Sequence, residues 1–196
     1  MSPEEMKRIA YHEAGHAIIG VHEGFPPANI EVHREGASVR TSYEMLNGST
    51  MAFVSSRLRL LLGGAVAQCL ILKPDIPYCR KDAYSRIDAK SDWEKARELI
   101  GVLLHNENTG QNTEPGMLLR KADEIEERHA AEARAILEAN ENVLQRIAEL
   151  VITGFAELNL VQAPPPAGPR LVVNPIGVEA ALEEVVSVLH PTCSVK

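Results

Sequence analysis

The chain has 196 residues, of which 45% are hydrophobic and 24% are charged, so its length and composition indicate one globular domain, or one domain with an appendage. Aromatic residues make up only 4%, and because alanine, leucine, isoleucine and glutamate are abundant, we expect helix to outweigh sheet. The formal net charge of −7 argues against a nucleic-acid-binding protein, because phosphate recognition needs a basic surface.

The cysteines and the apolar segments indicate the cellular compartment. Three cysteines, at positions 69, 79 and 193, match no disulfide framework or zinc-binding spacing, which indicates free thiols in a reducing compartment. The acidic first residues do not resemble a signal peptide. The most apolar stretch, 58–72, is too short to cross a bilayer. We therefore expect a cytoplasmic protein without a membrane span.

The first 72 residues predict a helix, a β-hairpin and a second helix. The opening residues form a capping box with proline at the first helical position, and the helix that follows should end near Gly24. Residues 30–43 alternate between apolar and polar types, which predicts a small hairpin. A second helix is expected over about 51–72. It contains Gly63 and Gly64, for which we expect a packing role and no catalytic one.

The next elements are predicted to be helical apart from one irregular connection over 73–90. The sequence SDWE, starting at Ser91, is a second capping box and predicts a helix over 91–104. A long helical stretch over 117–152 follows, and we expect it to break near 140–142 because asparagine and glutamate interrupt its apolar period.

The C-terminal part of the chain predicts a change in organisation. The long helical stretch should close at Gly154, and residues 1–160 would then form one mainly α domain with a small β-hairpin. The proline-rich segment 161–170 predicts an extended linker. The tail 171–196 is expected to contain one short helix near 178–189, and it can either pack back on the domain or bind a partner.

The residues HEAGH, from His12 to His16, fit the HExxH pattern within the first predicted helix. Residues four apart share one face of a helix, so both imidazoles can bind one metal ion. Glu13 lies next to that face and can accept a proton from a water molecule acidified by zinc. The segment predicts a Zn²⁺-dependent hydrolase of amide bonds, with a chance match to the pattern as the alternative.

A catalytic zinc site needs a third protein ligand, and the sequence offers several candidates. His22 has the spacing of the third metzincin histidine, but the glycine that this pattern requires is missing. Glu35 lies at a gluzincin-like distance but falls in the hairpin turn. Asp92, in the first turn of a predicted helix, is the strongest candidate, ahead of Asp88 and Asp82, although carboxylates at helix N-termini are also common without a metal.

The segment YHEAGHAIIG, residues 11–20, resembles the active-site helix of the FtsH-type AAA+ zinc proteases. In that family a short β-element, a helix with a glycine pair and a helix opening with a zinc-binding aspartate follow in the order found here. Residues 62–67 are similar to the glycine-pair segment, 91–96 to the aspartate segment, and 135–150 to the late helices. The resemblance covers roughly residues 5–160.

This resemblance implies a helical, zincin-like peptidase fold. It implies that His12, His16 and Asp92 bind zinc and that Glu13 is the general base. The chain departs from the family at three positions of the second predicted helix, Ala65, Gln68 and Cys69, and it contains no P-loop. We therefore expect a peptidase domain alone.

The expected partner is a protein or peptide substrate. Either a separate ATPase or adaptor unfolds that substrate, or the substrate is already unfolded, flexible or small. The family forms hexameric rings, and the oligomeric state is left open. A second hypothesis is that strand residues 30–33 pair with an extended substrate. The alternative is that the hairpin has a purely structural role. The alternative function is a catalytically silent or regulatory helical interaction module that retains the peptidase fold.

Overall fold

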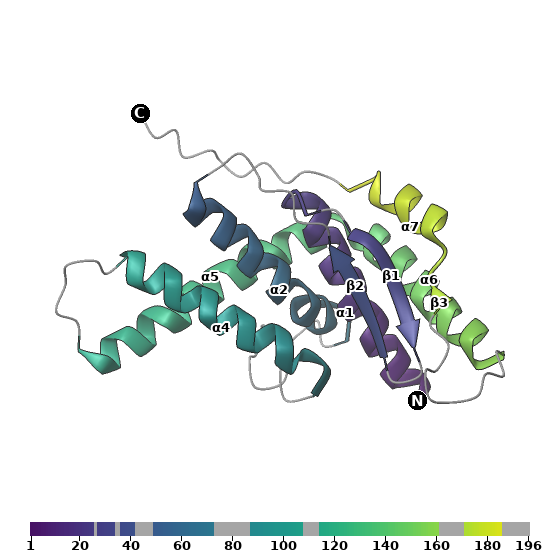
Figure 1. Ribbon diagram of the computed structural model, residues 1–196, viewed down its shortest axis with the longest axis horizontal. Helices are drawn as coiled ribbons and strands as arrows, with labels where there is room; N and C mark the ends of the chain where they lie inside the picture. The colour runs from purple at the N-terminus through teal and green to yellow at the C-terminus, as the bar shows by residue number, and fades with distance from the viewer. Residues whose placement is uncertain are drawn as a thin grey trace.

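The computed structural model describes residues 1–25, 27–33, 36–41, 49–72, 87–107, 114–160 and 171–185. Helices account for most of these residues, and a small antiparallel sheet lies along one side of them (Figure 1). The predicted mainly α fold with a small sheet is therefore confirmed. Several predicted features lie outside the described residues: Glu35, Asp82, the connection over 73–86, the linker 161–170 and the end of the tail, 186–196.

The first helix, α1 (Pro3–His22), lies at the centre of the fold. Its N-terminus has the predicted capping box, because Ser2 Oγ accepts a hydrogen bond from the Glu5 N–H and the Glu5 carboxylate accepts one from the Ser2 N–H. The helix ends before Gly24, whose φ of 79° favours glycine. Residues 9–20 are all buried, so this part of α1 is covered on every side and its polar residues, His12, Glu13 and His16, are held inside the protein.

The second helix, α2 (Thr50–Leu72), crosses α1 at a short distance because both helices have glycine at the contact. A Cβ on Gly15 would lie 2.5 Å from the Gly63 carbonyl oxygen, and a Cβ on Gly63 would lie 2.8 Å from Ile19 Cγ1. The predicted packing role of Gly63 is confirmed. Among the described helices, α2 is the one long and apolar enough to cross a membrane, but 67% of its most apolar window is buried inside the fold.

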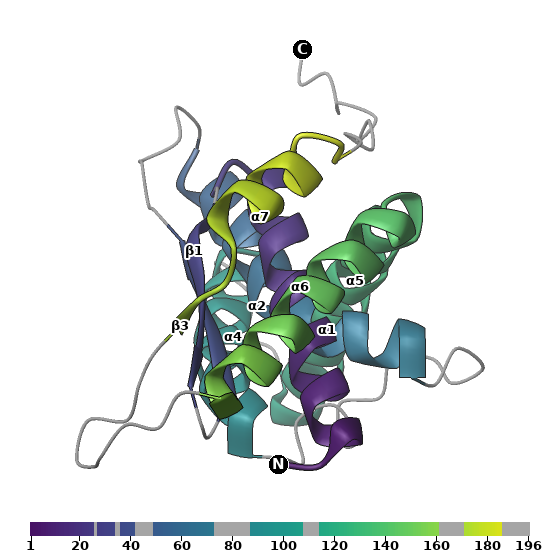
Figure 2. The ribbon, with the colours of Figure 1, turned by 90° about the vertical axis from the view of Figure 1, so that its right-hand side faces the viewer.

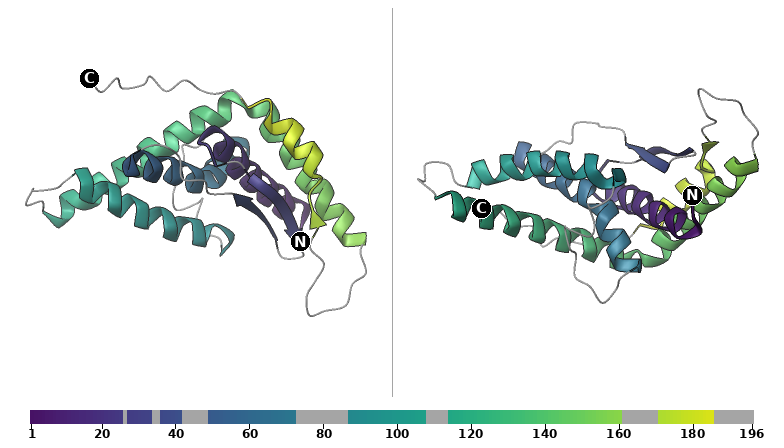
Figure 3. Two further views of the ribbon diagram at one scale, coloured as in Figure 1. Left: turned by 45° about the horizontal axis from the view of Figure 1, so that its top comes forward. Right: turned by 90° about the horizontal axis from the view of Figure 1, so that it is seen from below.

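Three long helices follow, α4 (Ile87–Glu107), α5 (Pro115–Ala139) and α6 (Glu141–Leu160). α4 and α5 lie side by side and extend together towards one end of the molecule, whereas α6 runs in a different direction and covers α1 (Figure 3). The predicted break near 140–142 is confirmed at Asn140, whose side-chain amide donates a hydrogen bond to the Ile136 carbonyl oxygen.

Two predicted helix ends are wrong. α4 begins at Ile87, one turn before the predicted start at Ser91, since no glycine or proline separates them and a capping motif does not prevent a helix from extending further back. α6 continues past Gly154 by more than a turn. A Cβ on Gly154 would lie 3.3 Å from Val32 and from Val173, so this glycine permits close packing on the sheet and does not end the helix.

The sheet has the strand order β2-β1-β3. β1 (Pro27–His33) and β2 (Gly36–Thr41) form the predicted hairpin, with Ile30 opposite Val39. On its other edge β1 pairs with β3 (Leu171–Val172), a two-residue strand too short for a sequence pattern to predict. Within the described residues β2 is therefore an edge strand, whereas β1 is paired on both sides.

The described part of the C-terminal tail packs back on the fold. α7 (Pro175–Leu182) lies across α6 (Figure 2). Its predicted start at residue 178 is wrong, because the Asn174 side chain caps the Gly177 N–H and proline occupies the first helical position. Four apolar residues of this segment are buried in the core: Val173, Val178, Ala181 and Leu182.

Candidate metal centre

Three side chains from two helices converge at one point. His12 and His16 lie one turn apart on α1, and their Nε2 atoms are 3.0 Å apart. Asp92, in the second turn of α4, places Oδ2 at 3.3 Å from His12 Nε2 and 3.1 Å from His16 Nε2. Ligand atoms held about 2.0–2.1 Å from a tetrahedral zinc ion lie about 3.3–3.4 Å apart. The structure thus brings together the three candidate ligands named from the sequence, in an arrangement that could hold one small cation.

Helix α2 determines how the two imidazoles lie. A Cβ on Gly64 would lie 2.7 Å from His12 Cε1, His12 Nε2 and His16 Nε2, so only glycine leaves room for both rings. One turn earlier, the Leu60 carbonyl oxygen accepts a hydrogen bond of 2.8 Å from His16 Nδ1, so that Nε2 is the ring nitrogen directed at the cluster. The expected packing role therefore holds for Gly64 as well, and its packing partners are the two imidazoles.

The charges in the cluster depend on one another. Burial favours neutral imidazole and lowers the pKa of His12. At His16 the Asp92 carboxylate outweighs the effect of burial and raises the pKa to about 9. Burial would raise the pKa of Asp92, but the two imidazoles outweigh it and hold that pKa well below its usual range. A cation that binds here must therefore displace the proton of His16.

Glu13 follows His12 on α1 and borders the same site. Its side chain is buried, and Oε2 accepts a hydrogen bond of 2.9 Å from the Val39 backbone N–H on β2. This contact joins the site helix to the edge strand of the sheet. It also fixes the orientation of a carboxylate that would otherwise rotate freely about its side-chain bonds.

A pocket of about 480 Å³ lies beside these groups, within the range of about 300–1,000 Å³ that is usual for ligand sites. Glu13, His16 and Asp92 line one part of it, and residues 37–40 of β2 line another. The hypothesis that residues 30–33 pair with an extended substrate is wrong, because β1 is already paired on both edges. β2 is the strand that borders the pocket.

The structure describes the backbone of two further candidate ligands, His22 and Asp88. His22 is at the end of α1, with Nδ1 at 3.4 Å from Glu23 Oε1, and is not part of the three-residue group. Asp88 lies in the first turn of α4. Because α4 starts before the predicted residue, Asp92 lies beyond the first turn, where attraction to the helix N-terminus is weak. That attraction alone does not explain the position of Asp92 between two histidines.

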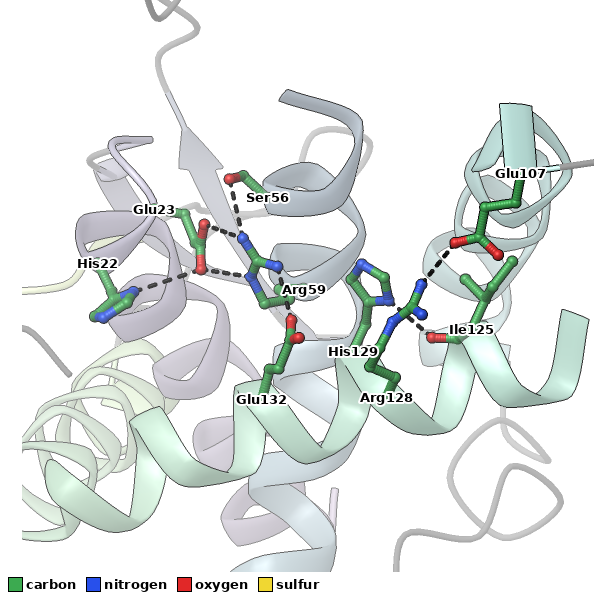
Figure 4. A network of polar contacts seen from close by, with 9 residues as sticks. All are labelled: His22, Glu23, Ser56, Arg59, Glu107, Ile125, Arg128, His129 and Glu132. Atoms are coloured by element: carbon green, nitrogen blue, oxygen red, sulfur yellow. Dashed lines mark hydrogen bonds and ion pairs between the residues drawn. The ribbon is translucent and has the colours of Figure 1, made fainter. Parts of the chain in front are cut away.

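Sequence reasoning missed a buried ion-pair network around Arg59. Its Nε and Nη2 donate to the Glu23 carboxylate at 2.6 and 2.8 Å, and its Nη1 donates to Glu132 at 2.8 Å (Figure 4). Arg59 therefore joins α2 to the end of α1 and to α5. Because Leu60, the next residue, holds His16, the network also helps to position the site. The signal in the sequence was the position of Arg59 inside the most apolar stretch of the chain, 58–72.

Comparison with models of protein families finds none that matches this chain, and a search of curated proteins finds no match. The chemistry of the site must therefore be argued from its own groups. Two imidazole nitrogens and one carboxylate oxygen form a donor set that suits zinc and leaves one coordination position for water or substrate. A second, oriented carboxylate beside such an ion is typical of hydrolytic sites.

Proposed function

We propose that the chain is a zinc-dependent peptidase in which His12, His16 and Asp92 hold the ion. The observation that supports this most strongly is the convergence of three donor atoms, 3.0–3.3 Å apart, beside a pocket that Glu13 borders. The resemblance to the FtsH-type zinc proteases agrees with the same four residues in the same roles. When bound, zinc would supply Lewis acidity towards the scissile carbonyl and would lower the pKa of a water molecule.

Glu13 is the group best placed to transfer protons. Its carboxylate is buried and held by the Val39 N–H, so it can accept a proton from the attacking water in a fixed orientation. The water oxygen adds to the carbonyl carbon, the C–N bond breaks, and Glu13 gives the proton to the leaving amine nitrogen. Glu13 ends the reaction ionised, as it began.

The second strand favours an extended peptide as the substrate. Residues 37–40 of β2 border the pocket, and β2 is an edge strand within the described part of the chain. A peptide backbone can add to such an edge by main-chain hydrogen bonds. We therefore propose that β2 aligns the substrate, in place of the strand named from the sequence.

Zinc content and cleavage of an unfolded protein substrate test this proposal. The purified protein should contain about one zinc per chain, and His16→Ala and Asp92→Ala should lose most of it. Glu13→Gln should keep the zinc but lose about 10²–10⁴-fold in kcat. His105→Ala, which removes an exposed imidazole from the last turn of α4, is the matched control and should change neither.

Two results would contradict the proposal in different ways. A wild-type protein that binds no zinc when zinc is supplied would reject the proposed peptidase activity. The alternative function, a catalytically silent interaction module, would then remain. Zinc that is lost in His16→Ala but retained in Asp92→Ala would reject Asp92 as the third ligand.

A further inference from the structure

Cationic side chains surround the pocket next to the proposed catalytic groups. Arg40 comes from β2, Arg57 from α2 and Lys95 from α4. Among the described residues that line the pocket, the acidic ones are Glu13 and Asp92, and each already has a role in the proposed site. An excess of cations here contrasts with the formal net charge of −7 for the whole chain.

Two of these cations lie on the same helix faces as residues that build the site. Lys95 follows Asp92 by three residues on α4, and Arg57 precedes Leu60 by three residues on α2. Residues three apart in a helix share a face. Both side chains therefore border the same opening as the metal cluster, which agrees with their place in the pocket lining.

Arg40 and Lys95 are both exposed, but they differ in their acidic neighbours. The Arg40 guanidinium lies 3.4 Å from the Glu31 carboxylate, which offsets part of its charge. Lys95 has no carboxylate at ion-pair distance within the described ranges. Arg57 and Lys95 come from two helices that pack together, and the buried residues Leu60 and Leu61 give the same pocket an apolar surface.

We propose that Arg57 and Lys95 form a subsite for a carboxylate of the substrate, so that the enzyme prefers an acidic group near the bond it cleaves. This inference rests on the proposed peptidase function and adds the substrate class to it. A glutamate side chain fits such a surface, since its methylene groups can lie on the leucines while its carboxylate accepts charge-assisted hydrogen bonds. A free C-terminal carboxylate offers the same chemistry.

The size of the preference follows from the exposure of the subsite. A charge-assisted hydrogen bond at a partly exposed site is stronger than a neutral one, but solvent weakens it. We expect a glutamate-containing peptide to bind about five- to tenfold more tightly than the same peptide with glutamine.

Binding to the zinc-loaded Glu13→Gln protein tests the subsite without cleavage. Acetylated and amidated alanine-rich peptides containing one Glu, one Gln or one Lys are compared by titration calorimetry, together with the Gln peptide carrying a free C-terminus. The Glu peptide should bind most tightly. Tighter binding of the free-acid peptide would support the carboxylate subsite and assign it to the substrate C-terminus.

Variants in the same Glu13→Gln background assign the preference to residues. Arg57→Gln and Lys95→Gln should each remove most of the preference while retaining zinc, and Lys95→Glu should make the Lys peptide bind more tightly than the Glu peptide. Arg120→Gln changes the charge equally at an exposed position of α5 outside this lining and should preserve the preference.

Failure of the subsite and failure of the peptidase can be told apart. Equal affinity for all the peptides, or no detectable binding of any, would overturn the subsite. Charge-dependent binding without cleavage by the wild-type protein would leave the subsite standing and reject the peptidase. Cleavage without any preference for acidic peptides would support the peptidase and reject the subsite.

Discussion

Replacing Gly64 with alanine should weaken zinc binding far more than it weakens folding. The new Cβ would lie 2.7 Å from ring atoms of both His12 and His16, whereas ordinary van der Waals contact begins at 3.4 Å. The rings must therefore move by roughly 0.7 Å, because the surrounding core is closely packed and α2 cannot retreat from α1.

A movement of this size is large for a metal site, in which ligand distances hold to within about 0.2 Å. Loss of supporting contacts around a metal ligand typically costs about 10–100-fold in affinity. Since two ligands are displaced together, we expect the Kd for zinc to rise by about 100-fold or more. Overpacking should cost about 1–3 kcal/mol of folding free energy, and the higher helix propensity of alanine should offset up to about 1 kcal/mol of that.

Competition with a chromogenic chelator measures the zinc affinity, and urea unfolding in excess chelator measures the stability of the metal-free protein. Gly101→Ala is the first control, because a Cβ there meets nothing within 4 Å, and it should keep its zinc affinity. Gly15→Ala is the second control. Its Cβ would lie 2.5 Å from a backbone carbonyl oxygen, which cannot rotate away, so this variant should lose stability itself.

Zinc affinity in Gly64→Ala within about twofold of the wild-type value would refute the argument that this glycine makes room for both imidazoles. A loss of stability as large as that of Gly15→Ala would refute the separation between the metal site and the fold.

Three further predictions concern stability measured by urea unfolding. Arg59→Met should lower the free energy of unfolding by about 3–5 kcal/mol, because it leaves the Glu23 carboxylate buried without its cation. The control Arg128→Met removes an exposed ion pair and should cost less than about 1 kcal/mol. Equal losses of stability in the two variants would contradict the argument from burial. Burial alone would raise the pKa of Glu23, but Arg59 outweighs it and holds the pKa below its ordinary 4.5. The ionised Glu23 carboxylate therefore stabilises the fold fully above pH 4.5, and this stabilisation is lost as the pH falls through the lowered pKa. Below that pH the wild type should lose stability more steeply than Glu23→Gln, and parallel pH profiles would reject this assignment. Val173→Ala removes buried methyl groups and should cost about 2 kcal/mol of folding free energy. The control Ile176→Ala changes a side chain that is 77% exposed and should alter stability by less than about 0.5 kcal/mol. Similar losses of stability in the two variants would contradict the packing of the tail on the fold.

Local signals explain the sequence predictions that the structure confirms. The capping box at Ser2, the alternation over 30–43 and the break near Asn140 each depend on neighbouring residues, and local patterns describe such features well. The predicted helix end at Gly154 failed because that glycine serves a contact with the sheet. A contact between distant segments changes the meaning of a residue without changing its local pattern.

In the candidate site, too, local spacing predicts some of the residues and contacts between distant segments bring in the others. Spacing alone places His12 and His16 on one face, because the helix fixes residues four apart. Asp92 comes from a distant helix. Its position near a predicted helix start made it the strongest of several acidic candidates, and the family resemblance strengthened that choice. The Leu60 carbonyl and the Val39 N–H are backbone groups that almost any residue supplies, so no sequence pattern marks them.

The pairing of β1 with β3 has a consequence for synthesis of the chain. The ribosome completes the candidate metal ligands and β2 before α5 begins, but it reaches β3 only after α6. At 5–20 residues per second, β1 emerges on the order of ten seconds before the strand that covers its second edge. An unpaired strand edge is a template for other chains. The nascent protein is therefore most open to aggregation after β1 and β2 are complete and before β3, which covers the second edge of β1, arrives.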